Sequence, residues 1–422
     1  RSALHNNWGG CHNNAMGYQA MYSNTTGCYN NAMGYGALYC NTTGKCNTSF
    51  GYQSMYYGVS GCDNFGAGYR SLHCNNGCYN TAIGYRALCV NDTGNHNVAF
   101  GCGALQSNTT GGANFAALNS ALGSTTTGGC NVGIGSCAMA SNTTGTSNVG
   151  IGLKAGYLNT TGCNNTAIGQ QALQNNITGS CNISLGFESL CGSLSGSNNL
   201  AVGFRTLRNN WGGCHNNGIG VYALYTNTTG CHNTGIGQCA LCGNTTGDQN
   251  FAVGVEALKN NTTGDSNQAV GCLALNNNTT GGNNTAIGYF SLLSNTTGSY
   301  NAAIGASALQ GSLSGSHNFA AGYRALYSNW GGCCNAAIGY HALYCNTTGI
   351  RNTGIGPYAL KENTTGTYNQ ALGYYSLACN TTGNDNVAIG HSSMEQNTTG
   401  SCNNSIGYAA LNKNTTGNCN NV

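Results

Sequence analysis

The stretch Asn80-Thr81-Ala82-Ile83-Gly84 sets the architecture, because its pattern returns every seventeen residues along the 422-residue chain. If its glycine is taken as position 0, that position recurs in 24 copies up to Gly407, and Leu118 is the single substitution. One register slip of a single residue lies near 75–77. Repeats of a fixed short period indicate a stacked array. The sequence therefore predicts a single continuous repeat domain over residues 1–422.

Each position of the repeat has a constant character. Position 16, directly before the glycine, is apolar, as in Ile83, and position 15 is small, as in Ala82. Ala-Leu or a close relative fills positions 3 and 4, a second Gly follows at position 10, and position 13 is always Asn. One copy buries only about three small or medium side chains, which is too few to fold alone. Stacked copies would bury a continuous thin core.

The period and the glycines favour strands over helices. Seventeen residues are few for a helical repeat, and Gly with β-branched residues weakens helices. We predict an all-β parallel β-solenoid of about 25 coils, with two or three short strands per coil and Gly and Asn at the corners. Coils would rise by about 4.8 Å, so that like positions form ladders. The invariant Asn would form one ladder, with its amide bonded to turn backbone.

Aromatic residues recur at position 1, directly after the repeated glycine. We interpret them as a packed stack, and a stripe that binds sugars or a partner is the alternative. The residues are Tyr18, Tyr35, Tyr52, Tyr69, Tyr85, Tyr323 and Tyr340.

Several cysteines share a position in adjacent coils. A spacing of about 4.8 Å lies within the range of Cα distances that a disulfide spans, so we predict coil-to-coil disulfides. The 25 cysteines indicate an oxidising, extracellular or cell-surface location, and their odd number leaves one thiol free or paired with another chain. The predicted pairs are Cys11 with Cys28, Cys62 with Cys78, Cys214 with Cys231, and Cys402 with Cys419.

The loop at positions 7–10 usually reads Asn-Thr-Thr-Gly, and 17 of the 24 copies form an N-x-S/T sequon. A polar loop repeated on one edge favours N-glycosylation, and covalent glycans would keep a nearly uncharged chain dissolved. The alternatives are simple turn chemistry and, for stacked Thr, an ice-binding face. The predicted glycosylation sites are Asn24, Asn41, Asn91, Asn108, Asn142, Asn159, Asn176, Asn227, Asn244, Asn261, Asn278, Asn295, Asn346, Asn363, Asn380, Asn397 and Asn414.

The composition argues against several function classes. Lys and Arg number 12 and Asp and Glu number 9, a charged fraction of 5%, where about 25% is ordinary. A net charge of +3 spread over scattered side chains gives no basis for binding nucleic acid. No apolar run approaches the roughly 18 residues of a membrane span, so we expect none.

Two clusters contain residue types that could form a metal site or a catalytic site. Cys214-His215 stacked on Cys231-His232 offers four ligands for zinc, but a disulfide with surface histidines is the favoured interpretation. Asp248 and Asp265 would stack as a calcium site or a carboxylate pair, but exposed turn residues explain them as well. We therefore predict no catalytic residue, no metal site and no cofactor, and do not expect an enzyme.

The Asn80–Gly84 stretch and its counterpart Asn386-Val387-Ala388-Ile389-Gly390 resemble the head repeats of YadA-like trimeric autotransporter adhesins. Related tracts occur in phage tail-fibre-like proteins. The resemblance covers the whole chain. It implies a parallel β-roll exposed outside the cell, commonly trimeric, that binds surfaces or matrix.

Together these patterns favour a structural subunit of an extracellular fibre or filament. Neither end carries a polar cap, so we expect the chain to associate with other copies of itself, end to end or laterally. The alternative is an adhesin or fibre-shaft module that binds surfaces or glycans.

Overall fold

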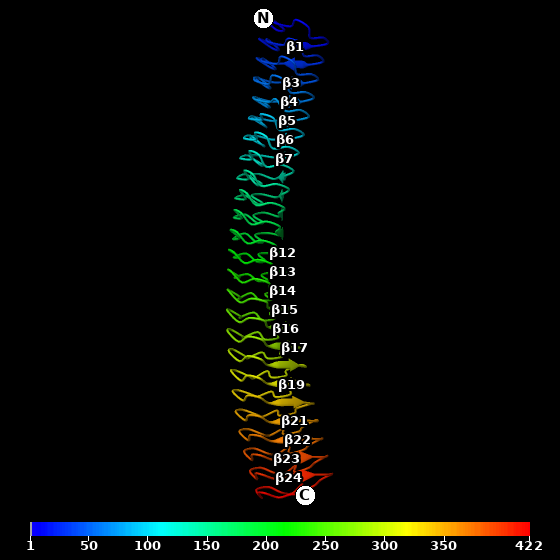
Figure 1. The fold of residues 1–422 in the computed structure, drawn as a ribbon, viewed down its shortest axis with the longest axis vertical. Coiled ribbons are helices and arrows are strands. Elements are labelled where there is room, and N and C mark those ends of the chain that lie inside the picture. The colour runs from blue at the N-terminus through cyan, green and yellow to red at the C-terminus, as the bar shows by residue number, and fades with distance from the viewer. Residues whose placement is uncertain (1) are drawn as a thin grey trace. The chain divides into compact units, whose positions relative to one another are not determined.

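The predicted fold class is confirmed. A computed structural model describes residues 2–422 as an all-β parallel β-solenoid, and no helix occurs in this range. The chain divides into two units, of which the first ends at Gly213 and the second begins at Cys214. Consecutive coils lie directly against one another within each unit, as β3 to β7 do in Figure 1. The single domain expected over 1–422 stays a prediction.

Each coil of the first unit contributes one strand of three residues, which pairs in parallel with the strand of the next coil. The register advances by one repeat, so that Asn14 lies opposite Asn31. The strands are β1 (Asn14–Met16), β2 (Asn31–Met33), β3 (Thr48–Phe50), β4 (Phe65–Ala67), β5 (Thr81–Ile83), β6 (Val98–Phe100), β7 (Phe115–Ala117), β8 (Val132–Ile134), β9 (Val149–Ile151), β10 (Thr166–Ile168), β11 (Ile183–Leu185) and β12 (Leu200–Val202).

The second unit repeats this arrangement, with Asn217 opposite Thr234 and so on along the unit. Its strands are β13 (Asn217–Ile219), β14 (Thr234–Ile236), β15 (Phe251–Val253), β16 (Gln268–Val270), β17 (Thr285–Ile287), β18 (Ala302–Ile304), β19 (Phe319–Ala321), β20 (Ala336–Ile338), β21 (Thr353–Ile355), β22 (Gln370–Leu372), β23 (Val387–Ile389) and β24 (Asn404–Ile406).

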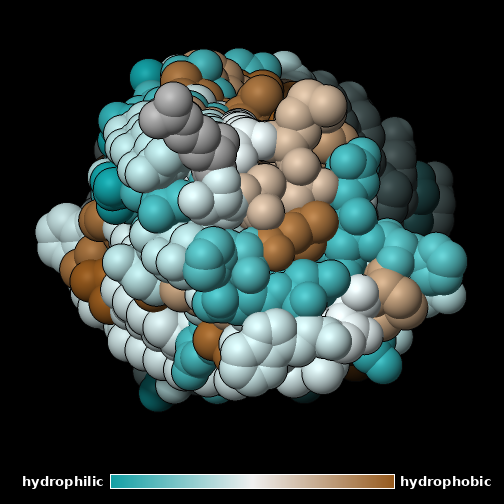
Figure 2. All heavy atoms as spheres, turned by 90° about the horizontal axis from the view of Figure 1, so that it is seen from above, coloured by the Kyte–Doolittle hydropathy of each residue, from teal (hydrophilic) through white to brown (hydrophobic). Residues whose placement is uncertain are grey.

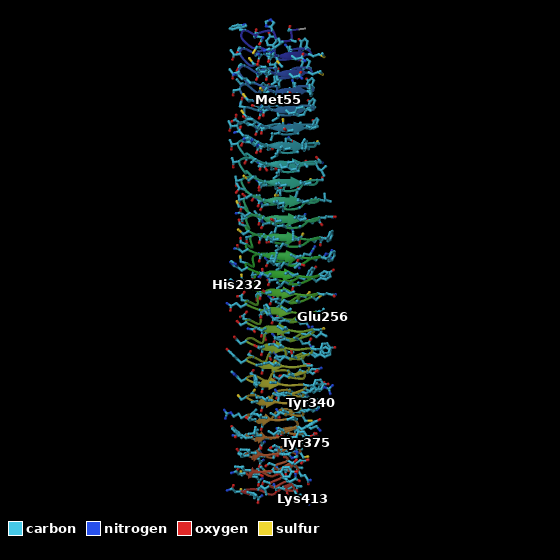
Figure 3. All side chains as sticks on the ribbon, turned by 90° about the vertical axis from the view of Figure 1, so that its right-hand side faces the viewer. Met55, His232, Glu256, Tyr340, Tyr375 and Lys413 are labelled. Carbon is cyan, nitrogen blue, oxygen red and sulfur yellow. The ribbon has the colours of Figure 1, made fainter. Side chains whose placement is uncertain are left out.

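The core of each coil consists of small and medium side chains from positions 3, 4 and 15. Ala274, Leu275 and Ala286 are fully buried, and Met55, another position-4 residue, which Figure 3 labels, is 2% exposed. Because successive side chains of a strand point to opposite faces, the buried position 15 sends positions 14 and 16 outward. Ile287 is accordingly 41% exposed. The apolar residue before the repeated glycine therefore faces out of the coil.

One strand per coil forms, not the two or three predicted. Positions 2, 4 and 12 adopt left-handed backbone, with φ of 54° at Glu256, 52° at Leu258 and 57° at Ser266. Left-handed residues interrupt extended backbone at positions 2, 4 and 12, and positions 5–11 between them form turns, bends and irregular backbone, as at 259–265. Backbone bonds between coils nevertheless continue there, as from Leu258 N–H to the Ala274 carbonyl at 2.9 Å.

The repeated glycine is required by its conformation and by the neighbouring coil. Gly254 has a φ of +135°, and a Cβ there would lie 2.5 Å from the Gly271 carbonyl oxygen. Such a contact forces the backbone to move. Leu118, the one substitution, has a φ of 82°. It therefore retains a left-handed conformation that costs an L-residue about 1–2 kcal/mol.

Replacing Leu118 by Gly is expected to raise the free energy of unfolding by about 0.5–1 kcal/mol. The gain is the strain removed, less the extra entropy that Gly loses on folding. The Leu118 side chain is 57% exposed and has little packing to lose. Chemical denaturation measures the change, and Leu153→Gly, at an exposed leucine without positive φ, serves as the control that should not gain stability. A loss of stability in Leu118→Gly would contradict the strain.

The predicted ladder of invariant asparagines at position 13 is confirmed. The backbone N–H of Asn284 donates to Asn267 Oδ1 at 3.0 Å, and Asn284 Nδ2 donates to the Gly298 carbonyl at 2.8 Å. Both asparagines are fully buried. Each amide thus joins its own coil to the coil before and the coil after it, and satisfies corner backbone that would cost about 1–3 kcal/mol if left unpaired.

A second ladder, which the sequence analysis did not predict, is formed by the asparagines at position 7. Asn278 Nδ2 donates to Asn261 Oδ1 at 2.8 Å and to the carbonyl of Gly281 at 2.8 Å. Asn295 Nδ2 repeats the bond to Asn278 Oδ1 at 2.8 Å. Identical buried amides therefore form hydrogen-bonded columns along the inside of the coils wherever successive coils have Asn at position 7.

The position-7 ladder is interrupted where Ser or Thr replaces Asn. In the second unit Ser312 Oγ and Asn295 Oδ1 are both buried and lack a hydrogen-bond partner. In the first unit the same two-atom defect occurs at Ser193 with Asn176 and at Thr125 with Asn108. A hydroxyl is too short to reach the amide of the preceding coil, so both atoms remain unsatisfied.

Ser312→Asn is expected to raise the free energy of unfolding by about 1–2 kcal/mol, since it satisfies one buried acceptor and removes an unpaired hydroxyl. The flanking coils already accommodate Asn at this position. Ser314→Asn, at an exposed position in the same loop, is the matched control and should change stability little. Equal shifts of the denaturation midpoint in the two variants would argue against a broken ladder.

Candidate interaction surfaces

The most extended surface feature is a row of apolar side chains on the outward face of the strands. In the second unit every coil contributes one such residue at position 16, and most are between 36% and 60% exposed. We name this row the apolar ridge. Its members are Ile219, Ile236, Val253, Val270, Ile287, Ile304, Ala321, Ile338, Ile355, Leu372, Ile389 and Ile406.

The apolar ridge lies in a face without charge. Within residues 2–422, positions 14, 16 and 1 hold no Lys, Arg, Asp or Glu in any coil. A hollow of about 180 Å³ indents the face between Thr353, Ile355, Gln370, Leu372 and Ile389. Figure 2 shows brown, apolar atoms reaching the surface of the molecule. The sequence signal for this face is the apolar residue directly before the repeated glycine, which points to the same side as the residue two positions earlier, whether that residue is polar, as Thr353 and Gln370 are, or apolar.

The few charged side chains project elsewhere, mostly at positions 2, 5 and 6, and some of them form ion pairs. Arg205 Nε and Arg208 Nε each lie 2.8 Å from Glu188 Oε2. Burial favours the neutral form of Glu188, but hydrogen bonds from Arg208 and Arg205 outweigh burial and hold the pKa of this carboxyl below its ordinary value. Lys259 and Glu256 form another pair at 3.0 Å. These charges satisfy one another within the coil surface.

The position-1 tyrosines stack as predicted. From Tyr18 to Tyr85 the ring centroids of adjacent coils are 5.1–5.3 Å apart and the planes differ by 16° or less. Tyr323 and Tyr340 stack at 5.5 Å in the second unit. Aromatic recognition of a sugar uses an open ring face, whereas here the faces of adjacent rings cover one another. The geometry therefore favours packing over a sugar-binding stripe.

The asparagines of the predicted sequons are inside the coil, so their expected exposure is wrong. Sixteen of the 17 are buried, and Asn414 in the last coil is half-buried. Their Nδ2 atoms donate both along the ladder and to the loop glycine, as Asn261 does to Asn244 and Gly264. A glycan on Nδ2 would replace one of the two hydrogens that make these bonds. The sequons mark a structural ladder, and the alternative of turn chemistry describes them better.

The two threonines of the loop have different environments. The hydroxyl of the first donates to the backbone of the next coil, as Thr262 Oγ1 does to the Thr279 carbonyl at 3.0 Å. The second, such as Thr263 or Thr280, is exposed. Each regular loop therefore presents one outward threonine, and the other hydroxyl is committed to joining coils.

The predicted cysteine pairs lie in contact across adjacent coils. Cys11 N–H donates to Cys28 Sγ at 3.2 Å, and the Cys11 thiol donates to the same sulfur at 2.8 Å. The hydrogen bond from the Cys11 thiol lowers the pKa of Cys28, and Lys45 contributes in the same direction. Both sulfurs are reachable from solvent and lie beside one another, so an oxidising environment could join them in a disulfide.

The other predicted pairs have the same placement. A backbone N–H to Sγ bond of 3.2 Å joins Cys62 to Cys78 and Cys214 to Cys231. The Cys402 thiol contacts that of Cys419, and burial with this contact raises the pKa of Cys402. Coil-to-coil disulfides stay a prediction at all four pairs.

The residues of the two candidate ligand clusters stack or bond between adjacent coils. His215 and His232 stack face to face, with centroids 4.9 Å apart and planes within 1°. Asp248 Oδ1 accepts the Cys231 N–H, and Asp265 Oδ1 accepts the Asp248 N–H, each at 2.7 Å. Over residues 2–422, no three His, Cys, Asp or Glu side chains converge as metal ligands. The aspartates cap the turns of adjacent coils.

Residues 2–422 contain no apolar helix of the length that a bilayer crossing requires. In Figure 3 His232 lies at one edge of the ribbon and Glu256 at the opposite edge, so positions 12 and 2 of the second unit face different sides. A comparison with models of known families and with curated proteins finds no match, so the outward rows of side chains are the evidence for function.

Proposed function

We propose that the chain is a structural subunit of an extracellular fibre and that it associates side by side with second copies through the apolar ridge. The observation that carries the proposal is the ridge itself, which is exposed, uncharged and present in every coil of the second unit. Monomeric soluble proteins rarely expose apolar patches of more than a few hundred Å². A ridge of this length therefore calls for a partner.

A second copy of the chain is the partner that fits the ridge. Its side chains repeat once per coil, about 4.8 Å apart, and another copy carries the same spacing and can meet it in register along the whole unit. Twelve coils extend over roughly 58 Å, and a strip about 10 Å wide covers about 600 Å² on each partner. The total of about 1,200 Å² reaches the lower range of stable protein interfaces.

The interior of the coils suits a load-bearing role. The position-13 ladder, the runs of the position-7 ladder between its interruptions and the backbone bonds between coils join neighbouring repeats, so extension along the axis must break many hydrogen bonds together. The stacked cysteine pairs would add covalent staples in an oxidising environment. These features support a fibre, because they strengthen the chain along its axis.

Sedimentation of the intact chain over a range of concentrations, with negative-stain electron microscopy, tests the proposal. We expect reversible association into laterally paired particles, whose width is a multiple of that of one chain. Particles that grow only in length would show end-to-end joining instead and would contradict the role of the ridge. Single chains at every concentration would overturn the proposed assembly.

A further inference from the structure

Five tyrosines in successive coils of the first unit form the most regular aromatic stack of the molecule. We name Tyr18, Tyr35, Tyr52, Tyr69 and Tyr85 the tyrosine ladder. Its four ring contacts have centroid distances of 5.2, 5.1, 5.3 and 5.1 Å. Each ring is between 38% and 53% exposed. The rings therefore cover one another by their faces and leave their edges to solvent.

We propose that the tyrosine ladder is a site of oxidative cross-linking, at which dityrosine bonds join successive coils. The biological purpose of the cross-links rests on the proposed fibre function, because covalent bonds between coils would strengthen a fibre. The chemistry requires only one chain. The ladder holds reacting rings side by side before oxidation, and such positioning raises the effective concentration of one ring at the next far above that in solution.

The reaction needs an external oxidant, and a peroxidase with hydrogen peroxide supplies it. Each of two neighbouring phenols loses one electron and one proton and becomes a phenoxyl radical. The radicals couple through ring carbons ortho to the hydroxyls, and each coupled carbon then loses its hydrogen as the ring regains aromaticity and its phenol. One carbon–carbon bond forms and two C–H bonds break. The two electrons and two protons reduce one hydrogen peroxide to two waters.

Other aromatic contacts of the first unit are less suited to this reaction. The exposed Tyr29 and Tyr79 stack on His12 and His96, at 4.9 Å each, and have no tyrosine against their faces. A second tyrosine stack at position 5 runs through Tyr39, but its rings are less exposed, and burial raises the pKa of Tyr39. In the first unit, the tyrosine ladder combines stacked tyrosine partners with open edges over five successive coils. The exposed Tyr323 and Tyr340 repeat this arrangement as a single pair in the second unit.

The test treats the dilute, intact chain with peroxidase and limiting hydrogen peroxide and maps the products by dityrosine fluorescence and peptide mass. We expect linked peptides that join Tyr35 to Tyr52 and Tyr52 to Tyr69, each two hydrogens lighter than the sum of its parts. Their yield should be independent of protein concentration. Tyr52→Phe removes two of the four contacts and should lower the yield from the ladder by about half, whereas Tyr79→Phe should leave it unchanged.

Three results would overturn the proposal: no dityrosine in the dilute chain, links spread equally over Tyr29 and Tyr79, or a yield that rises with concentration. Circular dichroism of Tyr52→Phe establishes that the variant is folded, so a lower yield reports the missing ring. The experiment is independent of lateral association. Cross-linking in a chain that sediments as a monomer would support the tyrosine ladder and reject the fibre assembly. Lateral association without cross-linking would support the fibre assembly and reject the tyrosine ladder as a cross-linking site.

Discussion

Asn278→Asp should lower the free energy of unfolding by about 3–5 kcal/mol at neutral pH, because it places an unpaired charge inside the position-7 ladder. Asn278 is fully buried, and its Nδ2 makes two bonds, to Asn261 Oδ1 and to the Gly281 carbonyl. An ionised carboxylate cannot donate either hydrogen bond, and its negative charge is repelled by the two acceptor oxygens, Asn261 Oδ1 and the Gly281 carbonyl oxygen. The loss in free energy of unfolding is therefore largest at pH values at which the carboxylate is ionised.

This loss should depend on pH with a definite sign. Burial beside oxygen acceptors raises the pKa of the new Asp in the folded state above its unfolded value of about 4. The folded state then binds more protons than the unfolded state above that pH, so the stability of the variant relative to the parent falls as pH rises. Denaturation at several pH values measures the slope. Hydrogen exchange should localise the weakening to the coils beside Asn278.

Asn277→Asp is the matched control for the buried substitution. Asn277 is the preceding residue and is exposed, and its Oδ1 accepts a bond from Asn260 Nδ2 at 3.1 Å, which a carboxylate also accepts. It should change stability by less than about 0.5 kcal/mol. If both variants lose the same stability, the ladder does not carry the energy assigned to it.

The period alone was sufficient to predict the fold and one of its two ladders. A residue that recurs every seventeen positions must meet its own kind in the next coil once the chain is a solenoid, so the Asn284 ladder follows from the repeat. The contacts of Cys11 with Cys28 and of Tyr35 with Tyr52 follow in the same way. These predictions need only the stacking and not the shape of the coil.

The direction in which a side chain points could not be predicted from the period. Asn-Thr-Thr-Gly reads as a polar surface loop, yet Asn261 turns inward because the amide of the next coil satisfies it. Conversely, Ile287 reads as core, but the three-residue strand sends it outward when Ala286 is buried. The turns that decide inside and outside contain left-handed residues at positions 2, 4 and 12. Residues of many types occupy positions 2 and 12, so the sequence does not mark those turns.

That outward direction leads to the second large effect, on assembly. Replacing both Ile287 and Ile304 by Lys is expected to weaken lateral association by at least about 100-fold. Each Ile that becomes buried between copies contributes about 1.5 kcal/mol or more, so two contribute about 3 kcal/mol, and the new charges on opposing copies repel. The two residues are 41% and 43% exposed in the single chain. Its fold should therefore change little.

Thr280→Lys with Thr297→Lys is the control, because these exposed threonines lie in the loops of neighbouring coils and the variant adds the same charge. Sedimentation should give single chains for the ridge variant and parent-like association for the loop variant. Equal weakening of both would mean that net charge, and not the ridge, governs assembly. If the ridge variant still pairs as the parent does, the copies meet through another face, and the apolar ridge would have to be explained by a different partner.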